Sequence, residues 1–412
     1  MKTFSPTSTT TKQVEDSLDW FEVSIVIPCL NEAETLETVL RKANRAIALH
    51  HLHAEIIVAD NGSTDGSQQI AMALGAEVVA VEMRGYGAAL QAGIECAKGN
   101  YIIMGDADDS YDFTAIFPFI QQLRMGFDLV MGCRLPQGGG TLMPGAMPWL
   151  HRWIGNPVLS GLGRLFFGSP VTDFHCGLRG FSRTWYATQD IQSTGMEFAS
   201  EMVMKATLHS ARITEIPITL HKDGRNRPPH LRTWRDGWRH LRFMLLYSPR
   251  WLFLIPGYLL FVTGAFLSGL LVMTPLTIGG VTFSTNTLLV SCMTMLLGFN
   301  LLTFSIFSKI FAISMKLLRP DSLTEQFFKK FSLELGLCLG SSLCLLGLIF
   351  IGSEVLTWIH SGFGPLPYYE SQRIVILGTT MLILGVETIF SSFLLSLLLI
   401  PRREGQATYA HQ

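Results

Sequence analysis

The 412-residue chain carries 31 Lys or Arg and 32 Asp or Glu residues, 48% hydrophobic residues and a mean hydropathy of +0.33. Charged residues make up only 15% of it, too few to cover the surface of a wholly soluble protein of this length. This composition excludes a disordered chain, a collagen-like fibre and a small disulfide scaffold. Seven scattered cysteines without a CxxC pair predict reduced thiols facing the cytosol and no structural zinc site.

The N-terminal half of the chain predicts an α/β domain. We expect the first 20 residues, rich in Ser and Thr and without an apolar core, to form a disordered tail rather than a signal peptide. The predicted strands that follow are 23–28, 55–60, 77–82 and 100–105, separated by helical patterns near 32–50, 64–74 and 87–98. Such alternation is typical of a mostly parallel sheet covered on both faces, with ligands bound beyond the carboxyl ends of the strands.

The first two predicted strands end in polar residues. The first reaches Pro28 and continues into Asn31 and Glu32, and the second reaches Asp60, followed by NGSTDGS with Ser63. Asn, Gly and Ser in that order are typical of a tight turn with a helix cap. The pattern therefore fits a purely structural turn as well as a binding loop.

The next two strands lead into a small-residue loop and an acidic loop. RGYGAA begins at Arg84 and opens a helix, so its backbone and the Arg are candidates to approach a phosphate. The fourth strand runs into Asp106, Asp108 and Asp109. Three acids in four residues repel one another unless a cation neutralises them, and their hard oxygens suit Mg²⁺ or Mn²⁺ bridging a diphosphate. The alternative is a solvated acidic turn.

Six motifs occur in a fixed order: IPCLNE at 27–32, DNGSTDGS at 60–67, RGYGAA at 84–89, DADD at 106–109, GCR at 132–134 and DFHCGLRGF at 173–181. In this order they resemble the family 2 glycosyltransferases with the Rossmann-like GT-A fold. The branch they resemble acts on polyisoprenyl phosphates and is typified by dolichyl-phosphate mannose synthase and bacterial polyprenyl-phosphate glucosyltransferases. The resemblance spans about residues 23–230, and we expect the GT-A domain to occupy 21–220.

The resemblance implies a donor site, a metal site and an acceptor site. It implies nucleotide-sugar binding by Pro28, Asn31, Glu32, Asp60, Ser63, Arg84 and Asp106, with Mg²⁺ or Mn²⁺ on Asp106 and Asp108. It implies contacts to the acceptor phosphate from Arg134, Arg179, Arg225 and Arg227, and catalytic roles for Asp173 and Arg179. The chain departs from the family pattern at DGRNRPPHLR, where related enzymes commonly have an Arg followed shortly by Gly, Ser and Lys.

The activity that the resemblance implies is transfer of a hexose from UDP-glucose or GDP-mannose to a polyprenyl phosphate in one inverting displacement. In related enzymes an Asp at the position of Asp173 is proposed as a general base. A phosphate monoester has its second pKa near ~6, so at pH 7 it is mostly a dianion and needs little help from a base. Our hypothesis is that Asp173 mainly orients Arg134 and Arg179 and the acceptor.

Three other functions stay open at this point. One is a glycosyltransferase that acts on a hydroxyl of a lipid-linked saccharide or a glycerolipid. A processive polysaccharide synthase is disfavoured, because LRTWRDGW at 231–238 lacks the Gln of a QxxRW signature. A membrane scaffold with a degenerate catalytic domain is disfavoured by the acids at Asp106, Asp108 and Asp173.

The C-terminal half predicts four membrane-spanning helices. No Asp, Glu, Lys or Arg occurs between Arg250 and Lys309, a stretch far longer than the ~20 apolar residues that one span requires. A turn at PLTIGG divides it, so the predicted spans are about 251–274, 281–307, 335–353 and 374–400. Glu387 is the acidic interruption of the fourth span, and we expect it to face the bundle interior or to snorkel.

Basic residues predict how the chain lies on its membrane. They concentrate between the second and third spans and after the fourth, which predicts that both termini, the α/β domain and a tail at 401–412 face the cytoplasm. The segment 221–250 is rich in Arg and carries Trp234 and Trp238, so we expect an amphipathic interfacial helix that binds anionic lipid. The remaining expectations are a homo-oligomer formed through the spans and no nucleic-acid partner.

Overall fold

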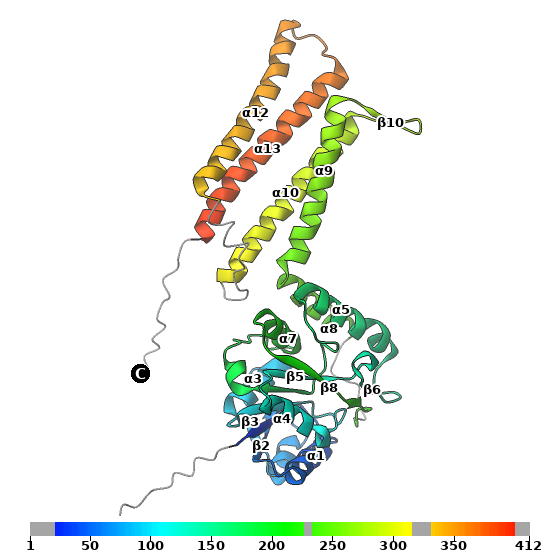
Figure 1. Cartoon of the computed structure of the whole chain (residues 1–412), viewed down its shortest axis with the longest axis vertical. Helices are drawn as coiled ribbons and strands as arrows, with labels where there is room; N and C mark the ends of the chain where they lie inside the picture. The colour runs from blue at the N-terminus through cyan, green and yellow to red at the C-terminus, as the bar shows by residue number, and fades with distance from the viewer. Residues whose placement is uncertain (1–20, 226–232, 315–330, 400–412) are drawn as a thin grey trace, which may run out of the picture. The chain divides into compact units, whose positions relative to one another are not determined.

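The computed structural model describes residues 21–225, 233–314 and 331–399. These residues fall into two compact units (Figure 1), one with the described residues up to Leu241 and one that begins at Arg242. We call the first the sheet unit and the second the helical unit. The tails predicted at 1–20 and 401–412 lie outside the described residues.

The sheet unit alternates strands and helices, as the sequence predicts. Its strands are β1 (Val23–Cys29), β2 (Ala54–Asp60), β3 (Glu77–Ala80), β4 (Tyr101–Met104), β5 (Leu129–Cys133), β6 (Thr141–Leu142), β7 (Arg179–Ser182), β8 (Ile213–Pro217) and β9 (Thr219–Leu220). Its helices are α1 (Leu36–Leu49), α2 (Ser67–Ala73), α3 (Tyr86–Cys96), α4 (Phe117–Arg124), α5 (Asn156–Phe167), α6 (Arg183–Ala187), α7 (Phe198–Leu208) and α8 (Thr233–Leu246). The last helix, α8, extends across the boundary into the helical unit.

Within the described residues, seven strands form one sheet in the order β3-β2-β1-β4-β7-β5-β8. Strand β7 pairs antiparallel with both β4 and β5, and the other neighbouring pairs are parallel. Strands β1 and β4 are buried along almost their whole length, which explains their continuous apolar sequences. The predicted α/β fold with a mostly parallel sheet is confirmed.

The strand order reverses beside β1, and this reversal positions the site. From β1 the chain moves outward to β2 and β3, and then returns through α3 to β4 on the other side of β1. In sheets of this kind ligands bind beyond the carboxyl ends of the strands where the order reverses, so we expect a ligand near the loops that leave β1 and β4. Glu32 follows β1 at this edge, and Asp106 and Asp108 follow β4.

Two predicted helices begin later than expected because their first residues form loops. The pattern predicted a helix from residue 32, but α1 begins at Leu36 after Asn31 adopts a positive φ of 57°. The second predicted helix, from residue 64, begins at Ser67, where the Asp65 carboxylate accepts hydrogen bonds from the Ser67 backbone N–H and hydroxyl. Both corrections lie in the loops that carry candidate site residues.

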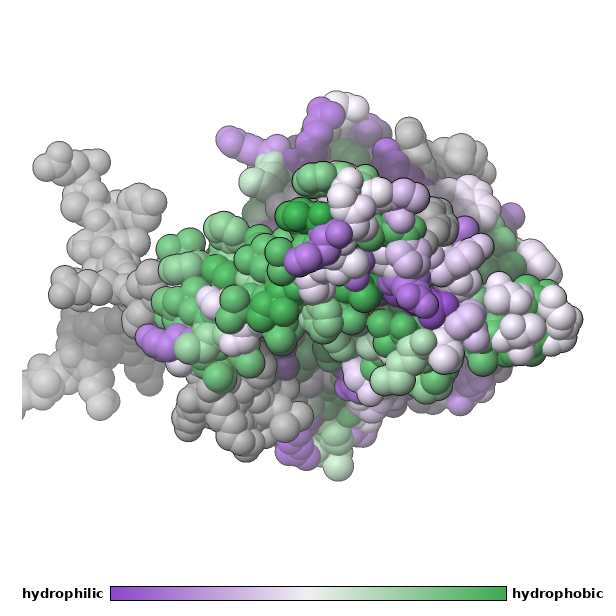
Figure 2. Space-filling view, turned by 90° about the horizontal axis from the view of Figure 1, so that it is seen from above, coloured by the Kyte–Doolittle hydropathy of each residue, from purple (hydrophilic) through white to green (hydrophobic). Residues whose placement is uncertain are grey.

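The helical unit contains four helices, within the described residues, that are long and apolar enough to cross a membrane. They are Arg250–Met273, Thr285–Ser314, Leu333–His360 and Tyr369–Leu398, which agree with the four predicted spans. The corresponding elements are α9 (Ile255–Met273), α10 (Thr285–Ser314), α12 (Leu333–His360) and α13 (Tyr368–Leu398). Many large hydrophobic side chains of these helices are exposed. Hydrophobic residues also gather on the face of the molecule that is seen from above (Figure 2).

The second predicted span, 281–307, starts too early. Its first residues belong to a hairpin of β10 (Leu276–Ile278) and β11 (Val281–Phe283), and α10 begins only at Thr285. Gly279 and Gly280 join the strands with positive φ values of 58° and 82°. A two-residue hairpin turn of this kind needs positive φ at both positions, which glycine provides without strain.

Glycines bring the membrane helices into close contact. A Cβ atom on Gly298 of α10 would lie 2.2 Å from the Phe261 nitrogen of α9. On α12, a Cβ at Gly340 would lie 2.8 Å from the Gly385 carbonyl oxygen of α13. Small residues at such contacts allow backbones to approach and pack tightly where apolar lipid provides no hydrophobic driving force. The helices are therefore paired as α9 with α10 and α12 with α13 (Figure 1).

Candidate active site

The Asp60 carboxylate accepts hydrogen bonds from the backbone of the turn that follows β2. Asp60 is 2% exposed and accepts hydrogen bonds from the Gly62 N–H at 3.2 Å, the Ser63 N–H at 3.0 Å and the Gln68 side chain at 2.6 Å. The Ser63 hydroxyl in turn accepts from the Asn31 N–H at 2.8 Å. The structure therefore brings together Asn31, Asp60 and Ser63, three of the residues predicted for the donor site, and their hydrogen bonds connect the loops after β1 and β2. Pro28, also predicted for the donor site, lies within β1 itself.

The glycines of RGYGAA accommodate another part of this chain. A Cβ atom on Gly85 would lie 2.2 Å from the Thr194 carbonyl oxygen, and one on Gly87 would lie 2.3 Å from that of Ser193. The Thr194 oxygen also accepts a hydrogen bond from the Ala88 N–H at 3.0 Å near the start of α3. The expectation that this loop leaves room for a phosphate at the helix start is therefore corrected, since backbone carbonyls lie there. Arg84 itself is exposed.

Asp106 and Asp108 lie close enough to influence each other's charge. Burial, followed by the negative charge of Asp108, raises the pKa of Asp106 to about 6. The Tyr86 hydroxyl donates a hydrogen bond to Asp106 at 2.9 Å, which partly offsets this effect. A Cβ atom at Gly177 would lie 2.6 Å from the Asp106 carboxylate, so the DFHCGLRGF segment packs directly against it. The predicted acidic pair and this motif thus form one site.

Arg225 connects the acidic loop to the loop after β1. Its Nη2 lies 2.7 Å from Asp108 Oδ2 and its Nε lies 3.1 Å from Glu32 Oε2. The Gly224 N–H donates to the Asp108 carbonyl oxygen at 3.0 Å, which holds the backbone beside the acids. The sequence placed Arg225 at an acceptor phosphate, whereas the structure places it on the predicted metal ligand. Arg227, predicted for the same role, lies outside the described residues.

The third acid of DADD does not join the other two. Asp109 forms an ion pair with Lys42 of α1 at 2.8 Å. Its positive φ of 61° turns the chain here. This distinguishes Asp109 from Asp108, although the two are neighbours in sequence.

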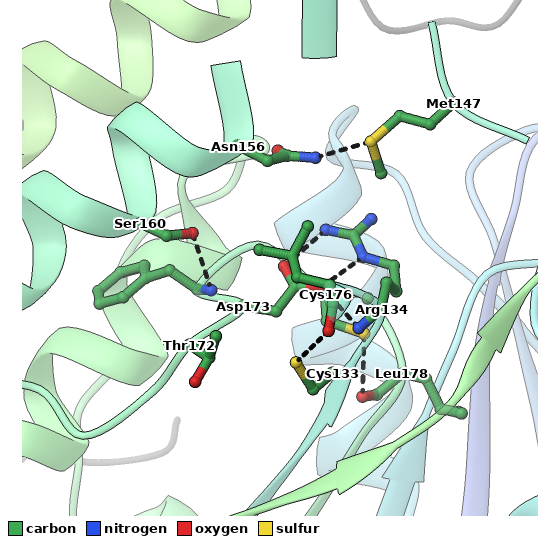
Figure 3. Close-up of polar contacts among 12 residues, drawn as sticks. Cys133, Arg134, Met147, Asn156, Ser160, Thr172, Asp173, Cys176 and Leu178 are labelled. Carbon is green, nitrogen blue, oxygen red and sulfur yellow. Dashed lines mark hydrogen bonds and ion pairs between the residues drawn. The ribbon is translucent and has the colours of Figure 1, made fainter. Parts of the chain in front are cut away.

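Arg134 and Asp173 form a buried pair with two parallel hydrogen bonds (Figure 3). Arg134 Nε and Nη2 donate to the two carboxylate oxygens at 2.7 Å and 2.8 Å, and the Arg134 backbone N–H donates at 2.9 Å. Burial favours a raised pKa for Asp173, but the charge and hydrogen bonds of Arg134 outweigh it and hold this pKa below its usual value. Arg134 Nη1 lies 3.5 Å from the Tyr111 hydroxyl.

Arg179 occupies a different environment from the one expected. It is fully buried, and its guanidinium donates to the backbone carbonyls of Cys176, Phe174 and Ala199. These contacts hold the segment after Asp173 in shape. They argue against the predicted contact of Arg179 with an acceptor phosphate and against a direct catalytic role.

The donor atoms present fit a divalent cation that completes its shell with other ligands. Asp106 and Asp108 offer hard carboxylate oxygens, and the charge of Asp108 adds to burial in raising the pKa of Asp106. Across the residues that the structure describes, no group of three or more His, Cys, Asp or Glu side chains could enclose a metal ion. Mg²⁺ commonly uses one or two carboxylates together with phosphate oxygens and water, so the pair is sufficient.

Sequence reasoning missed several residues that hold the site. Tyr86 donates to Asp106, and Glu215 accepts from the Asp173 N–H at 3.0 Å. Asn61 donates to the Met83 carbonyl and accepts from the Gly85 N–H at 2.7 Å, which fixes the loop after β3. Tyr86 and Asn61 belong to the motifs RGYGAA and DNGSTDGS, so the sequence could have indicated them as site residues. Nothing in the sequence around Glu215 signals its role.

Two known protein families match parts of this chain. Residues 24–188 match the family described as glycosyl transferase family 2, and residues 306–399 match the family described as glycosyltransferase family 2 C-terminal transmembrane region. The low-salt glycan biosynthesis hexosyltransferase Agl6 of Haloferax volcanii is 38% identical over 374 residues, which cover 90% of this chain and 88% of that protein. The match to Agl6 therefore extends through both units.

Two further similarities are confined to about half of the chain. A dolichyl-phosphate hexose transferase of Haloferax volcanii is 28% identical over 198 residues, which cover 48% of this chain and 82% of that protein. A solved structure of glucosyl-3-phosphoglycerate synthase from Mycobacterium tuberculosis, in complex with Mn²⁺, uridine diphosphate and glucosyl-3-phosphoglycerate, has 22% sequence identity and a TM-score of 0.40. That match covers 55% of this chain and 78% of the synthase chain.

Proposed function

The chain belongs to glycosyltransferase family 2, and we propose that it transfers a hexose from UDP-glucose or GDP-mannose to a polyprenyl phosphate at the cytoplasmic face of its membrane. The observation that carries the proposal is that Asp106 and Asp108 follow the carboxyl end of β4 and that Asp106 packs against Gly177, in the same segment as Asp173. In this proposal a donor site adjoins an acceptor site, in a chain with four helices long and apolar enough to cross a membrane.

The acidic pair forms the donor side of the proposed site. Asp106 and Asp108 would hold Mg²⁺ or Mn²⁺, and the bound cation would neutralise the charge that develops on the departing nucleoside diphosphate. The Tyr86 hydrogen bond keeps one Asp106 oxygen oriented before any ligand arrives. Glu32 follows β1, the strand that pairs with β4, and the resemblance places the nucleoside there.

Arg134 forms the acceptor side. Asp173 binds its Nε and Nη2, so the guanidinium is held in one orientation with Nη1 near Tyr111. A fixed guanidinium is suited to a lipid phosphate, because planar charged donors match phosphate oxygens. The lowered pKa of Asp173 makes it a weak base, which supports a positioning role for this carboxylate.

The substrate assignment is tested in membranes that contain the full chain, supplied with undecaprenyl phosphate, Mg²⁺ or Mn²⁺ and radiolabelled UDP-glucose or GDP-mannose. We expect one donor to label the lipid fraction with a product that mild acid cleaves, because glycosyl phosphates are acid-labile. A labelled lipid that resists mild acid would identify a hydroxyl acceptor and overturn the proposed substrate. The Asp108→Asn chain is the control for background transferases.

The positioning role of Asp173 is tested with Asp173→Asn. We expect this variant to retain appreciable turnover at saturating lipid phosphate while its KM for the lipid rises, because the amide orients Arg134 less well. A general base is worth about 10² to 10⁴ in rate, so a kcat loss of that size with unchanged KM would contradict positioning. Retained nucleotide and Mn²⁺ binding provides the check that the variant is folded.

A further inference from the structure

The guanidinium of Arg225 stands where a cation is expected. It lies between Asp108 Oδ2, at 2.7 Å, and Glu32 Oε2, at 3.1 Å, and its side chain is only 10% exposed. Asp108 is one of the two carboxylates proposed to bind a divalent metal, and its other oxygen already accepts the Ser110 hydroxyl at 2.6 Å. A metal ion and Arg225 therefore compete for the same Asp108 oxygen.

Electrostatics explains why a positive side chain rests there. Asp106, Asp108 and Glu32 bring three carboxylates to the ends of two neighbouring strands, and the charge of Arg225 is among the causes that lower the pKa of Asp106 against its burial. Without such a charge the acids repel one another, which raises their pKa values and weakens the fold around them. Arg225 thus supplies the counter-charge that a divalent ion would otherwise provide.

Arg225 is held by fewer hydrogen bonds than Arg134. The Arg134 side chain donates two parallel hydrogen bonds to the two carboxylate oxygens of Asp173. Arg225 Nε is buried but makes no hydrogen bond among the described residues, although its charge lies near Glu32. Its backbone neighbour Gly224 is anchored to the Asp108 carbonyl at 3.0 Å, so the side chain can leave while the segment stays in place.

We propose that Arg225 is an exchangeable counter-ion: it occupies the cation position in the empty site, is displaced by Mg²⁺ or Mn²⁺, and then pairs with the diphosphate that arrives with the metal. The inference rests on the proposed function, because it takes Asp108 as a metal ligand. It makes metal and nucleotide binding cooperative, since the metal releases the arginine and the nucleotide phosphates receive it. A free guanidinium is a strong partner for phosphate oxygens.

The test measures Mn²⁺ binding to the detergent-solubilised full chain by electron paramagnetic resonance, without any transfer reaction. In Arg225→Gln we expect Mn²⁺ alone to bind about tenfold more tightly than in the wild type, because its competitor is gone. We expect binding of UDP or GDP in the presence of Mn²⁺ to weaken about tenfold, because the phosphate partner is gone. These opposite shifts identify an exchangeable counter-ion.

Lys42→Gln is the matched control. It removes one positive charge from the same acidic loop, but Lys42 pairs with Asp109 rather than with Asp108. We expect it to change Mn²⁺ affinity less than twofold. An equal gain in Lys42→Gln would reduce the effect to general charge and overturn the proposal.

Other outcomes separate this inference from the proposed function. If Arg225→Gln binds Mn²⁺ alone no more tightly than the wild type, the counter-ion role fails while the metal site stands. If it binds the nucleotide as tightly as the wild type does, the exchange to phosphate fails. If the wild-type chain binds no Mn²⁺ even with UDP or GDP, the proposed metal site itself is wrong.

Discussion

In the sheet unit, buried charged groups join loops that are far apart in sequence, whereas in the helical unit glycines join helices that are neighbours in sequence. Arg225 reaches back to Glu32, and Arg134 reaches forward to Asp173. In the helical unit, by contrast, Gly298 contacts the preceding helix α9. The buried charges of Arg134 and Arg225 are tolerated in the sheet unit because each has a partner of opposite charge, and close backbone packing takes their place where lipid surrounds the helices.

The two units are therefore sensitive to different substitutions. A site built from ion pairs loses chemistry when one charge is neutralised, even where the shape of the side chain is kept. A helix pair built from glycines loses packing when one methyl group is added, even where no polar group changes. Matched positions within each unit therefore separate the loss of charge from the loss of packing.

Neutralising Asp108 should produce the largest effect. We expect Asp108→Asn to lower the transfer rate by roughly 10²-fold or more, because several kcal/mol of charge stabilisation would be lost with the metal. Asp109→Asn is the matched control, since Asp109 pairs with Lys42 and its positive φ suits Asn. Initial rates with a radiolabelled donor measure both variants. Equal losses in the two would show that the whole loop, rather than Asp108, carries the effect.

Adding a methyl group at a helix contact should produce the next largest effect. A Cβ at Gly298 would lie 2.2 Å from the Phe261 nitrogen, whereas a Cβ at Gly269 has no neighbour within 4 Å. We expect Gly298→Ala to destabilise the helical unit by about 2 kcal/mol, the usual scale of overpacking, and Gly269→Ala to be neutral or slightly stabilising. Denaturant unfolding in detergent micelles compares them. Two variants of equal stability would contradict glycine-mediated packing.

The sequence predicted local features of both units but not the contacts that join distant loops. Apolar runs and their spacing indicated β1, β2 and the four spans, because burial on both faces or in lipid leaves a continuous apolar signature. The acids after β4 were predicted because they follow a strand directly. The placement of Arg225 on Asp108 could not be predicted, since Arg225 follows β9 and its ion-pair partners follow β1 and β4.

The glycines of RGYGAA show a second limit. Their sequence is typical of a loop that approaches a phosphate, but they lie against the carbonyls of Ser193 and Thr194. A glycine permits close approach without specifying what approaches, and the segment that does so is about a hundred residues away. Arg179 presents the same problem, because the sequence alone does not distinguish an arginine that binds backbone carbonyls from one that binds phosphate.

A buried uncharged pair in the sheet unit predicts a pH effect. His175 and His240 lie with ring centroids 4.8 Å apart, and both His175 ring nitrogens are buried without a hydrogen-bond partner among the described residues. Burial, assisted by His240, Arg134 and Arg179, lowers the pKa of His175 well below its usual value. In the unfolded chain His175 binds a proton as pH falls through about 6.5, whereas in the folded chain it stays neutral to lower pH. The free energy of unfolding should therefore decrease as pH drops below about 6.5.

Substituting this ring should remove part of the pH dependence. We expect His175→Phe to flatten the decline in the unfolding temperature below pH 6.5, because each excluded proton weakens the fold by up to about 1.4 kcal/mol per pH unit. Thermal unfolding of the full chain between pH 5 and 8 measures the slope. His51→Asn, at an exposed position with positive φ, should leave the slope unchanged. A wild-type slope that persists in His175→Phe would assign the pH dependence to other groups.

The smallest expected effect comes from a polar contact between α10 and α13, which belong to different helix pairs of the helical unit. Asn300 of α10 donates to Glu387 of α13 at 3.0 Å, and the second Glu387 oxygen is buried without a hydrogen-bond partner among the described residues. Hydrogen bonds between membrane helices average about 0.6 kcal/mol, so a double-mutant cycle with Asn300→Leu and Glu387→Leu should give a coupling of that size. Glu387→Gln keeps an acceptor for Asn300 and should retain most of the stability that Glu387→Leu loses. A coupling near zero would mean that this hydrogen bond adds nothing to the contact between α10 and α13, whereas one well above 1 kcal/mol would show that the helical unit depends on a buried polar contact as the sheet unit does.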